Sequence, residues 1–189
     1  MTERELLVDC LRRLNGASIN YMLTGSMASN YWGIPRTTHD LDFVVQLPPT
    51  SIPAVVAAFR ENFHIDEAAM REAYRPPYQF NALDQRSALK VDFWMLRTEP
   101  FEQEMFRRRV PVTVFGVPAQ IATAEDVILH KLHWNTITPS DRQLSDAAGV
   151  VAVQRDKLDF AYLRRWAGVL RVTPTLEDLL AGRIAPKQT

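Results

Sequence analysis

The chain has 189 residues, of which 47% are hydrophobic, and its 22 basic and 22 acidic residues give a formal net charge of zero. This composition excludes a disordered chain and argues against a protein whose main task is to coat nucleic acid, although it leaves room for a local basic cleft. The single cysteine, Cys10, excludes an intrachain disulfide and favours a reducing compartment. No apolar run approaches the ~20 residues that cross a bilayer, and the first residues lack the apolar core of a signal peptide. We therefore expect a cytoplasmic protein without a membrane-spanning segment.

The first part of the chain mixes helical and strand patterns. In chain order we expect a helix over 3–15, a strand over 19–23, a helix over 26–32, a strand over 40–47, a helix over 51–63 with a Ser51 cap, strands over 78–83 and 88–96, a helix over 101–109, and a hairpin over 110–122 that turns at Gly116. The composition then changes, and helices are expected over 123–136, 141–154, 159–170 and 175–182. This pattern predicts an α+β protein with a mixed core over 1–120 and a helical region over 121–189 packed on it.

Acidic side chains gather at the start of the strand over 40–47. Because side chains alternate along a strand, Asp40 and Asp42 point to one face and the apolar residues between them to the other. Asp92 stands on the polar face of the strand over 88–96, so it joins the pair if the two strands are neighbours. Two carboxylates about 4 Å apart repel by ~4 kcal/mol at an effective dielectric near 20. A divalent cation or protonation of one carboxyl group would relieve this repulsion, and hard carboxylate oxygens suit Mg²⁺ or Mn²⁺.

A Gly-Ser pair precedes these carboxylates. Gly25 and Ser26 lie between the end of a strand and the start of a helix, where free backbone N–H groups favour anions. Glycine lets the backbone approach a triphosphate closely, and the Ser26 hydroxyl can donate a hydrogen bond to it. Read alone, Gly25-Ser26 is an ordinary turn and cap, and the acidic pair is a solvated strand end.

In this order, the motifs resemble the nucleotidyltransferase superfamily with the DNA polymerase beta-like fold. The resemblance rests on Gly25-Ser26, thirteen intervening residues, Asp40-Leu41-Asp42, and the later Asp92 in "KVDFW". The subtype "GxPRxTxDxDF", which begins at Gly33, and the later segments "TAEDVILHKLHW" and "RQLSD" look like the bacterial AbiEii-like branch, which is linked to toxin–antitoxin systems.

The resemblance implies a mixed β-sheet flanked by helices and an Mg²⁺-dependent (or Mn²⁺-dependent) transfer of NMP from an NTP to an acceptor hydroxyl. It implies metal-binding and catalytic roles for Asp40, Asp42 and Asp92. The acceptor it implies is RNA or protein for a toxin-like enzyme and a small molecule for an antibiotic-modifying relative. An operon-encoded protein partner is also expected on this basis.

Basic residues supply further candidates for the nucleotide site. Lys131 lies on the packed stripe of the helix over 123–136, where it either reaches a triphosphate or extends past core leucines to solvent. Arg36 either contacts nucleotide phosphate or holds its loop by pairing with an aspartate. For Asp146 we favour a plain helix pair with Arg142.

The leading prediction is therefore an Mg²⁺-dependent nucleotidyltransferase with Gly25, Ser26, Arg36 and Lys131 at the nucleotide. A non-catalytic nucleotide- or partner-binding module of the same fold is the alternative. A third reading is metal-dependent phosphohydrolase chemistry on the same carboxylates.

Overall fold

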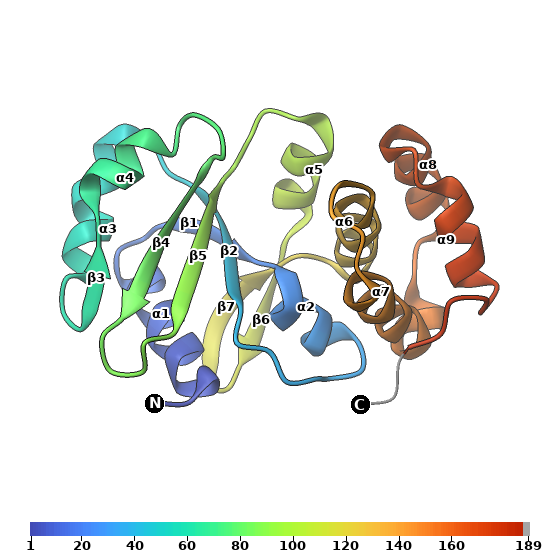
Figure 1. The fold of residues 1–189 in the computed structure, drawn as a ribbon, viewed down its shortest axis with the longest axis horizontal. Coiled ribbons are helices and arrows are strands. Elements are labelled where there is room, and N and C mark those ends of the chain that lie inside the picture. The colour runs from blue at the N-terminus through green and yellow to red at the C-terminus, as the bar shows by residue number, and fades with distance from the viewer. Residues whose placement is uncertain (187–189) are drawn as a thin grey trace. The chain divides into compact units, whose positions relative to one another are not determined.

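The structure is a computed structural model that describes residues 1–186 (Figure 1). These residues form two compact units. Unit 1 contains Met1–Thr24 and Thr38–Ile121, and unit 2 contains Gly25–Thr37 and the chain from Ala122 onward. The predicted boundary at residue 120 lies next to Ile121, where the chain leaves unit 1 and enters unit 2. The contacts also group the segment 25–37 with the later helices.

Unit 1 is built on a seven-stranded mixed sheet with the order β3-β4-β5-β2-β1-β7-β6. Its strands are β1 (Asn20–Leu23), β2 (Leu41–Gln46), β3 (Phe63–Ile65), β4 (Gln79–Asp84), β5 (Lys90–Met95), β6 (Val110–Val114) and β7 (Val117–Ile121). The β2–β5 and β1–β7 pairs are parallel, and the other neighbours are antiparallel. The sheet confirms the α+β class and the predicted strands, and Gly116 turns the β6–β7 hairpin with φ +81°.

One face of the sheet is covered by an aromatic core. The helices of this unit are α1 (Glu3–Gly16), η1 (Pro49–Ser51), α3 (Ile52–Phe59), α4 (Glu67–Glu72) and α5 (Pro100–Arg108). Phe43 of β2 stacks on Phe93 of β5, and Phe59 of α3 meets the same ring edge-on. Alternation then sends the even-numbered side chains of β2 and β5, including Asp42 and Asp92, to the opposite face.

The predicted helix over 51–63 is shorter in the structure than in the sequence analysis. It ends at Phe59, and Asn62, with φ +68°, leads the chain into β3. Ser51 stands at the N-cap position without a side-chain hydrogen bond. The short elements β3 and α4 were not predicted, and α4 is capped by Asp66, which accepts from the Ala68 N–H. A three-residue strand and a six-residue helix are too short to show a clear period.

Unit 2 is helical. It contains α2 (Gly25–Trp32), α6 (Ala124–Ile137), α7 (Asp141–Gln154), η2 (Arg155–Lys157), α8 (Phe160–Leu170) and α9 (Thr173–Leu180). These bounds confirm the helices that the sequence predicts after residue 122. Thr123 caps α6 by accepting from the Asp126 N–H.

The short helix α2 packs tightly on α7. A Cβ atom at Gly33 would lie 2.7 Å from the Val150 backbone nitrogen, so only glycine permits this approach. Gln154 of α7 donates to the Trp32 carbonyl. Asn30 then folds the following loop, since its side chain donates to the Arg36 carbonyl and accepts from the Arg36 N–H. These contacts fix the backbone that carries the Arg36 side chain.

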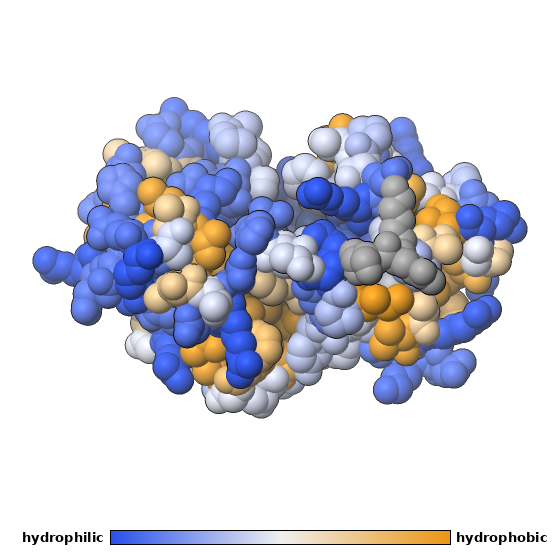
Figure 2. Space-filling view, turned by 60° about the horizontal axis from the view of Figure 1, so that its bottom comes forward, coloured by the Kyte–Doolittle hydropathy of each residue, from blue (hydrophilic) through white to orange (hydrophobic). Residues whose placement is uncertain are grey.

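Large hydrophobic side chains that reach the surface are scattered. They include Phe115, Ile137, Val153 and Val169, which belong to different elements. Figure 2 shows hydrophobic residues interspersed among hydrophilic ones on one face. Among the helices of residues 1–186, none combines the length and the hydropathy that a bilayer crossing requires.

Candidate active site

Two of the predicted carboxylates meet on the central strands of unit 1. Asp42 and Asp92 are register partners in the parallel β2–β5 pair. Asp42 Oδ1 accepts from Trp94 Nε1 at 3.3 Å. Asp92 Oδ2 lies 3.0 Å from Lys90 Nζ, and the Asp92 side chain is 13% exposed. The two strands are therefore neighbours, and the prediction from side-chain alternation is confirmed for Asp42 and Asp92.

The third predicted carboxylate lies outside the strand. Asp40 precedes β2, which begins at Leu41, and it is exposed. Its N–H donates to Thr38 Oγ1 at 3.2 Å, so the backbone at Asp40 follows a side-chain turn instead of the sheet ladder. The strand is one residue shorter here than predicted. Thr38 therefore braces the loop that leads into β2.

The carboxylate pair fits a hard divalent cation. Asp92 Oδ1 is buried and has no hydrogen-bond partner, which is costly for a carboxylate oxygen that faces no cation. Asp42 and Asp92 both offer oxygen donors of the kind that Mg²⁺ and Mn²⁺ prefer. Within residues 1–186, no group of three or more His, Cys, Asp or Glu side chains is arranged to hold a metal ion. The structure therefore joins Asp42 with Asp92, and the metal-binding role of all three aspartates stays a prediction.

Gly25 and Ser26 begin α2 in unit 2. Gly25 has φ +61°, a left-handed conformation that favours glycine and turns the chain into the helix. Ser26 is buried in the first turn, where backbone N–H groups have no intrahelical acceptor. Its Oγ accepts from Arg36 Nη2 at 2.9 Å. The phosphate-binding role of these two residues stays a prediction.

A buried ionic network links the basic candidates of the same unit. Arg36 donates from Nε to Asp146 Oδ1 at 2.7 Å and from Nη2 to Asp146 Oδ2 at 2.9 Å. Lys131 Nζ donates to Asp146 Oδ2 at 2.9 Å, with side chains only 7% and 4% exposed. Of the two roles considered for Arg36, the pairing with an aspartate is present, and the contact with nucleotide phosphate stays a prediction. Lys131 is too buried to extend into solvent.

The expected pairing of Asp146 with Arg142 is wrong, because Asp146 bonds to Arg36 and Lys131 instead. The local i, i+4 spacing suggested a surface pair, but α7 turns Asp146 inward. A signal in the sequence was available: Asp146 opens the run "DAAGVV", whose residues are all buried in α7. A carboxylate at the head of a buried apolar run needs a buried cation as its partner.

The network perturbs the titration of its carboxyl group. Burial by itself raises the pKa of Asp146, but the hydrogen bond from Arg36 and the charge of Lys131 outweigh burial. The net effect holds the pKa of Asp146 below its usual value. With two cations and one carboxylate, the network carries one net positive charge.

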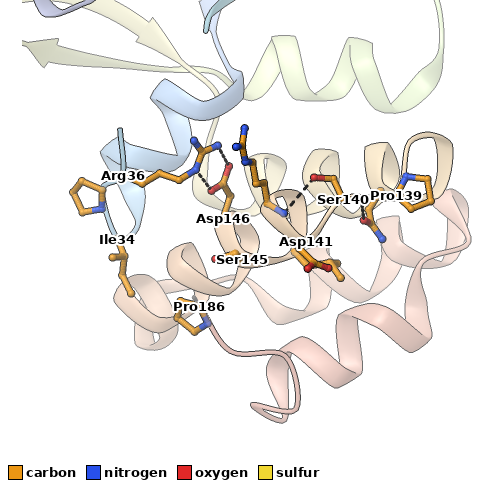
Figure 3. A pocket seen from close by; sticks show the side chains of 12 residues that line it. Ile34, Arg36, Pro139, Ser140, Asp141, Ser145, Asp146 and Pro186 are labelled. Carbon is orange, nitrogen blue, oxygen red and sulfur yellow. Dashed lines mark hydrogen bonds and ion pairs between the residues drawn. The ribbon is translucent and has the colours of Figure 1, made fainter. Parts of the chain in front are cut away.

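A pocket of about 910 Å³ opens beside this network (Figure 3). Its lining comes from the loop after α2, the end of α6 and its connection to α7, the first turns of α7, and Pro186 after α9. Figure 3 shows the Arg36 and Asp146 side chains pointing toward one another at its edge. Pockets of this size hold small-molecule ligands in other proteins.

Comparisons with known proteins place the fold. No protein-family model matches the sequence, and no curated protein matches it. The crystal structure of ANT(2'')-Ia in complex with adenylyl-2''-tobramycin matches with a TM-score of 0.63 at 13% identity, over 90% of this chain and 98% of that one. A solution structure of the antibiotic-resistance factor ANT(2'')-Ia matches with a TM-score of 0.54 at 13% identity, over 95% and 90%.

A further solved structure shows the same likeness. The crystal structure of an antigenic nucleotidyltransferase-like protein from Paracoccidioides brasiliensis matches with a TM-score of 0.56 at 13% identity, over 98% of this chain and 94% of that one. Likeness at this level of identity concerns the fold. The chain thus has a nucleotidyltransferase-like fold, as the sequence motifs predict.

Proposed function

We propose that this protein is a metal-dependent nucleotidyltransferase that moves NMP from an NTP to an acceptor hydroxyl. The observation that carries the proposal is the register pair Asp42 and Asp92, with the unpartnered buried Oδ1 of Asp92, in a chain of nucleotidyltransferase-like fold. The motif resemblance also supports membership of the AbiEii-like branch and a toxin-like role with an operon-encoded partner.

The carboxylates of unit 1 are assigned to the metal and to proton transfer. Asp42 and Asp92, together with Asp40, would hold Mg²⁺ or Mn²⁺. When bound, such a cation supplies neutralisation of the charge on the α-phosphate and on the leaving pyrophosphate. Asp92 would accept the proton of the acceptor hydroxyl. The acceptor oxygen then forms a bond to the α-phosphorus, the bond to the β-phosphate oxygen breaks, and pyrophosphate leaves.

The polar groups of unit 2 are assigned to the nucleotide. Gly25 and Ser26 would donate hydrogen bonds to phosphate oxygens from the first turn of α2. The net positive charge of the network that contains Arg36 and Lys131 would complement the triphosphate. These groups bind and orient, so their contribution to the rate is positioning.

Two observations support different classes of acceptor. The matched ANT(2'')-Ia structure holds an adenylated antibiotic, which supports a small-molecule acceptor. The AbiEii-like motif supports RNA or protein. We favour the small molecule, because only the fold likeness extends over nearly the whole chain.

The test is incubation with each labelled NTP, Mg²⁺ and acceptors of the three classes. We expect pyrophosphate release and a labelled acceptor, and we expect Asp42→Asn to lower the rate by roughly 100-fold or more, as for loss of a group that stabilises transition-state charge. Asp84→Asn is the matched control, because Asp84 is a buried carboxylate of β4 that bonds to Arg86 and Ser87. Equal activity of Asp42→Asn and the wild-type protein would contradict the proposal.

A non-catalytic nucleotide- or partner-binding module is the second candidate. It is favoured by the lack of a three-ligand group for a metal within the described residues. This candidate predicts that NTP binds and that no acceptor is labelled. Release of inorganic phosphate in place of pyrophosphate would instead indicate hydrolase chemistry on the same carboxylates.

A further inference from the structure

We propose that Asp146 is a positioning residue for the NTP phosphates, acting through Arg36 on the hydroxyl of Ser26. This inference rests on the proposed function and extends it to a residue of α7. All the side chains involved belong to unit 2.

Asp146 fixes the orientation of the Arg36 guanidinium. The Asp146 carboxylate accepts from both Nε and Nη2 of the guanidinium, which is the two-point geometry that fixes a guanidinium in its plane. The remaining edge is held as well, because Nη1 donates to the Thr37 carbonyl at 3.0 Å. The guanidinium is therefore locked, and a single hydrogen bond would not lock it.

Arg36 in turn determines the direction of the Ser26 proton. A hydroxyl has one proton and two acceptor sites, and Arg36 Nη2 occupies one acceptor site of Ser26 Oγ. Among residues 1–186, no hydrogen bond donated by the Ser26 hydroxyl is present. With Arg36 fixed as a donor, Ser26 is left to donate, and an anion is the natural acceptor for a donor at the start of a helix.

Asp146 also holds the ammonium group of Lys131. Its ammonium shares Oδ2 of Asp146 with Arg36 Nη2, so one carboxylate holds two cations in the interior. The two cations repel each other, and the negative charge of the Asp146 carboxylate offsets this repulsion and keeps them together. Asp146 therefore sets the position of both cationic groups to which we assign the triphosphate.

Positioning and simple charge predict opposite outcomes. Removal of a negative charge near an anion site would strengthen NTP binding if Asp146 acted only by its charge. If Asp146 acts by holding Arg36 against Ser26, its removal weakens NTP binding. The sign of the change in affinity separates the two roles.

The experiment is a double-mutant cycle on nucleotide binding. Calorimetry with Mg²⁺ and ATP, CTP, GTP or UTP identifies the NTP that the wild-type protein binds most tightly. We expect Asp146→Asn to weaken its binding about 10-fold or more, the range for a lost hydrogen-bond network to a charged group. In the Ser26→Ala background, the same change should cost less than about threefold, because coupled residues are not additive.

Asp126→Asn is the matched control. Asp126 is also a buried carboxylate of unit 2, but it accepts from two hydroxyl groups, those of Tyr162 at 2.6 Å and Thr123 at 2.7 Å. It should lower the melting temperature without changing the NTP affinity measured well below that temperature. If Asp146→Asn does not fold, as judged by circular dichroism, Asp146→Glu keeps the charge, displaces the carboxylate, and enters the same cycle.

The outcomes separate this inference from the proposed function. If Asp146→Asn binds the NTP more tightly or equally well, or if its effect adds to that of Ser26→Ala, the positioning role of Asp146 is overturned and the proposed function is not. A wild-type protein that binds none of the four NTPs overturns the proposed function and this role with it.

Discussion

At the scale of single residues, Asp146 illustrates how a buried charge is tolerated. Its carboxylate is 4% exposed and would be strongly destabilised without partners. Arg36 and Lys131 supply three hydrogen bonds to it, all charge-assisted. Removing one member of such a network leaves the others buried without compensation, which is more damaging than the net value of the contacts suggests.

The network predicts an acid-dependent stability. Because the pKa of Asp146 is lowered in the folded state, its stabilising effect is complete above the ordinary carboxyl pKa of about 3.9 and is lost as the pH falls through the lowered value. We expect Asp146→Asn to reduce the free energy of unfolding by about 3–5 kcal/mol at pH 7. Urea denaturation between pH 7 and pH 2.5 should show this difference constant above pH 5 and shrinking below pH 4.

A surface ion pair is the control for this measurement. Glu177 pairs with Arg164 at 2.8 Å, but both side chains are well exposed, at 42% and 56%. Glu177→Gln should leave the free energy of unfolding at pH 7 almost unchanged, because solvent screens an exposed pair. A wild-type advantage over Asp146→Asn that grows toward low pH would contradict the assigned direction of the pKa shift.

At the scale of elements, the contact between α2 and α7 depends on the absence of a side chain. The Gly33 backbone approaches the backbone of Gly149 and Val150 so closely that an added Cβ would lie 2.7–2.9 Å from it. Backbone atoms cannot rotate away, so one helix has to move. This packing holds the loop that presents Arg36.

Gly33→Ala should therefore separate α2 from α7. We expect a loss of about 1–3 kcal/mol in the free energy of unfolding, the usual cost of overpacking, measured by urea denaturation. Gly168→Ala is the matched control, because Gly168 lies within α8 and its added Cβ would meet no atom within 4 Å apart from its chain neighbours and its own helix backbone. That change should stabilise by about 0.5–1 kcal/mol, since alanine is the better helix former. If Gly33→Ala left the free energy of unfolding unchanged, the two helices would not pack as described.

At the scale of the whole molecule, the proposed function predicts that metal and nucleotide stabilise the folded state together. A ligand that binds only the folded protein stabilises it by about 2.7 kcal/mol at 100 times its Kd. We expect the melting temperature to rise with Mg²⁺ and the preferred NTP, and EDTA to reverse most of the rise.

The aspartate pair provides the contrast for this prediction. In Asp42→Asn, the shift in melting temperature should lose its dependence on Mg²⁺, while the Asp84→Asn control should keep it. A shift that is equal with Mg²⁺ and with EDTA would show that the carboxylates of β2 and β5 do not hold the metal.

Local patterns in the sequence were sufficient for most of the elements. The helices after residue 122 and the hairpin at Gly116 follow from periodicity and turn chemistry, which act within a few residues. The same reasoning put Asp42 and Asp92 on the polar faces of their strands, because side-chain alternation is a property of each strand alone. It missed β3 and α4, which are too short to display a period.

What only the tertiary structure decided is which distant segments meet. The parallel pairing of β2 with β5 makes Asp42 the partner of Asp92, and the grouping of residues 25–37 with the later helices brings Arg36 to Asp146. The sequence alone favoured a neighbour four residues away for Asp146, because spacing along one helix is all that a local pattern contains. Choice among partners a hundred residues apart depends on burial and packing of the whole chain, and those exist only once it has folded.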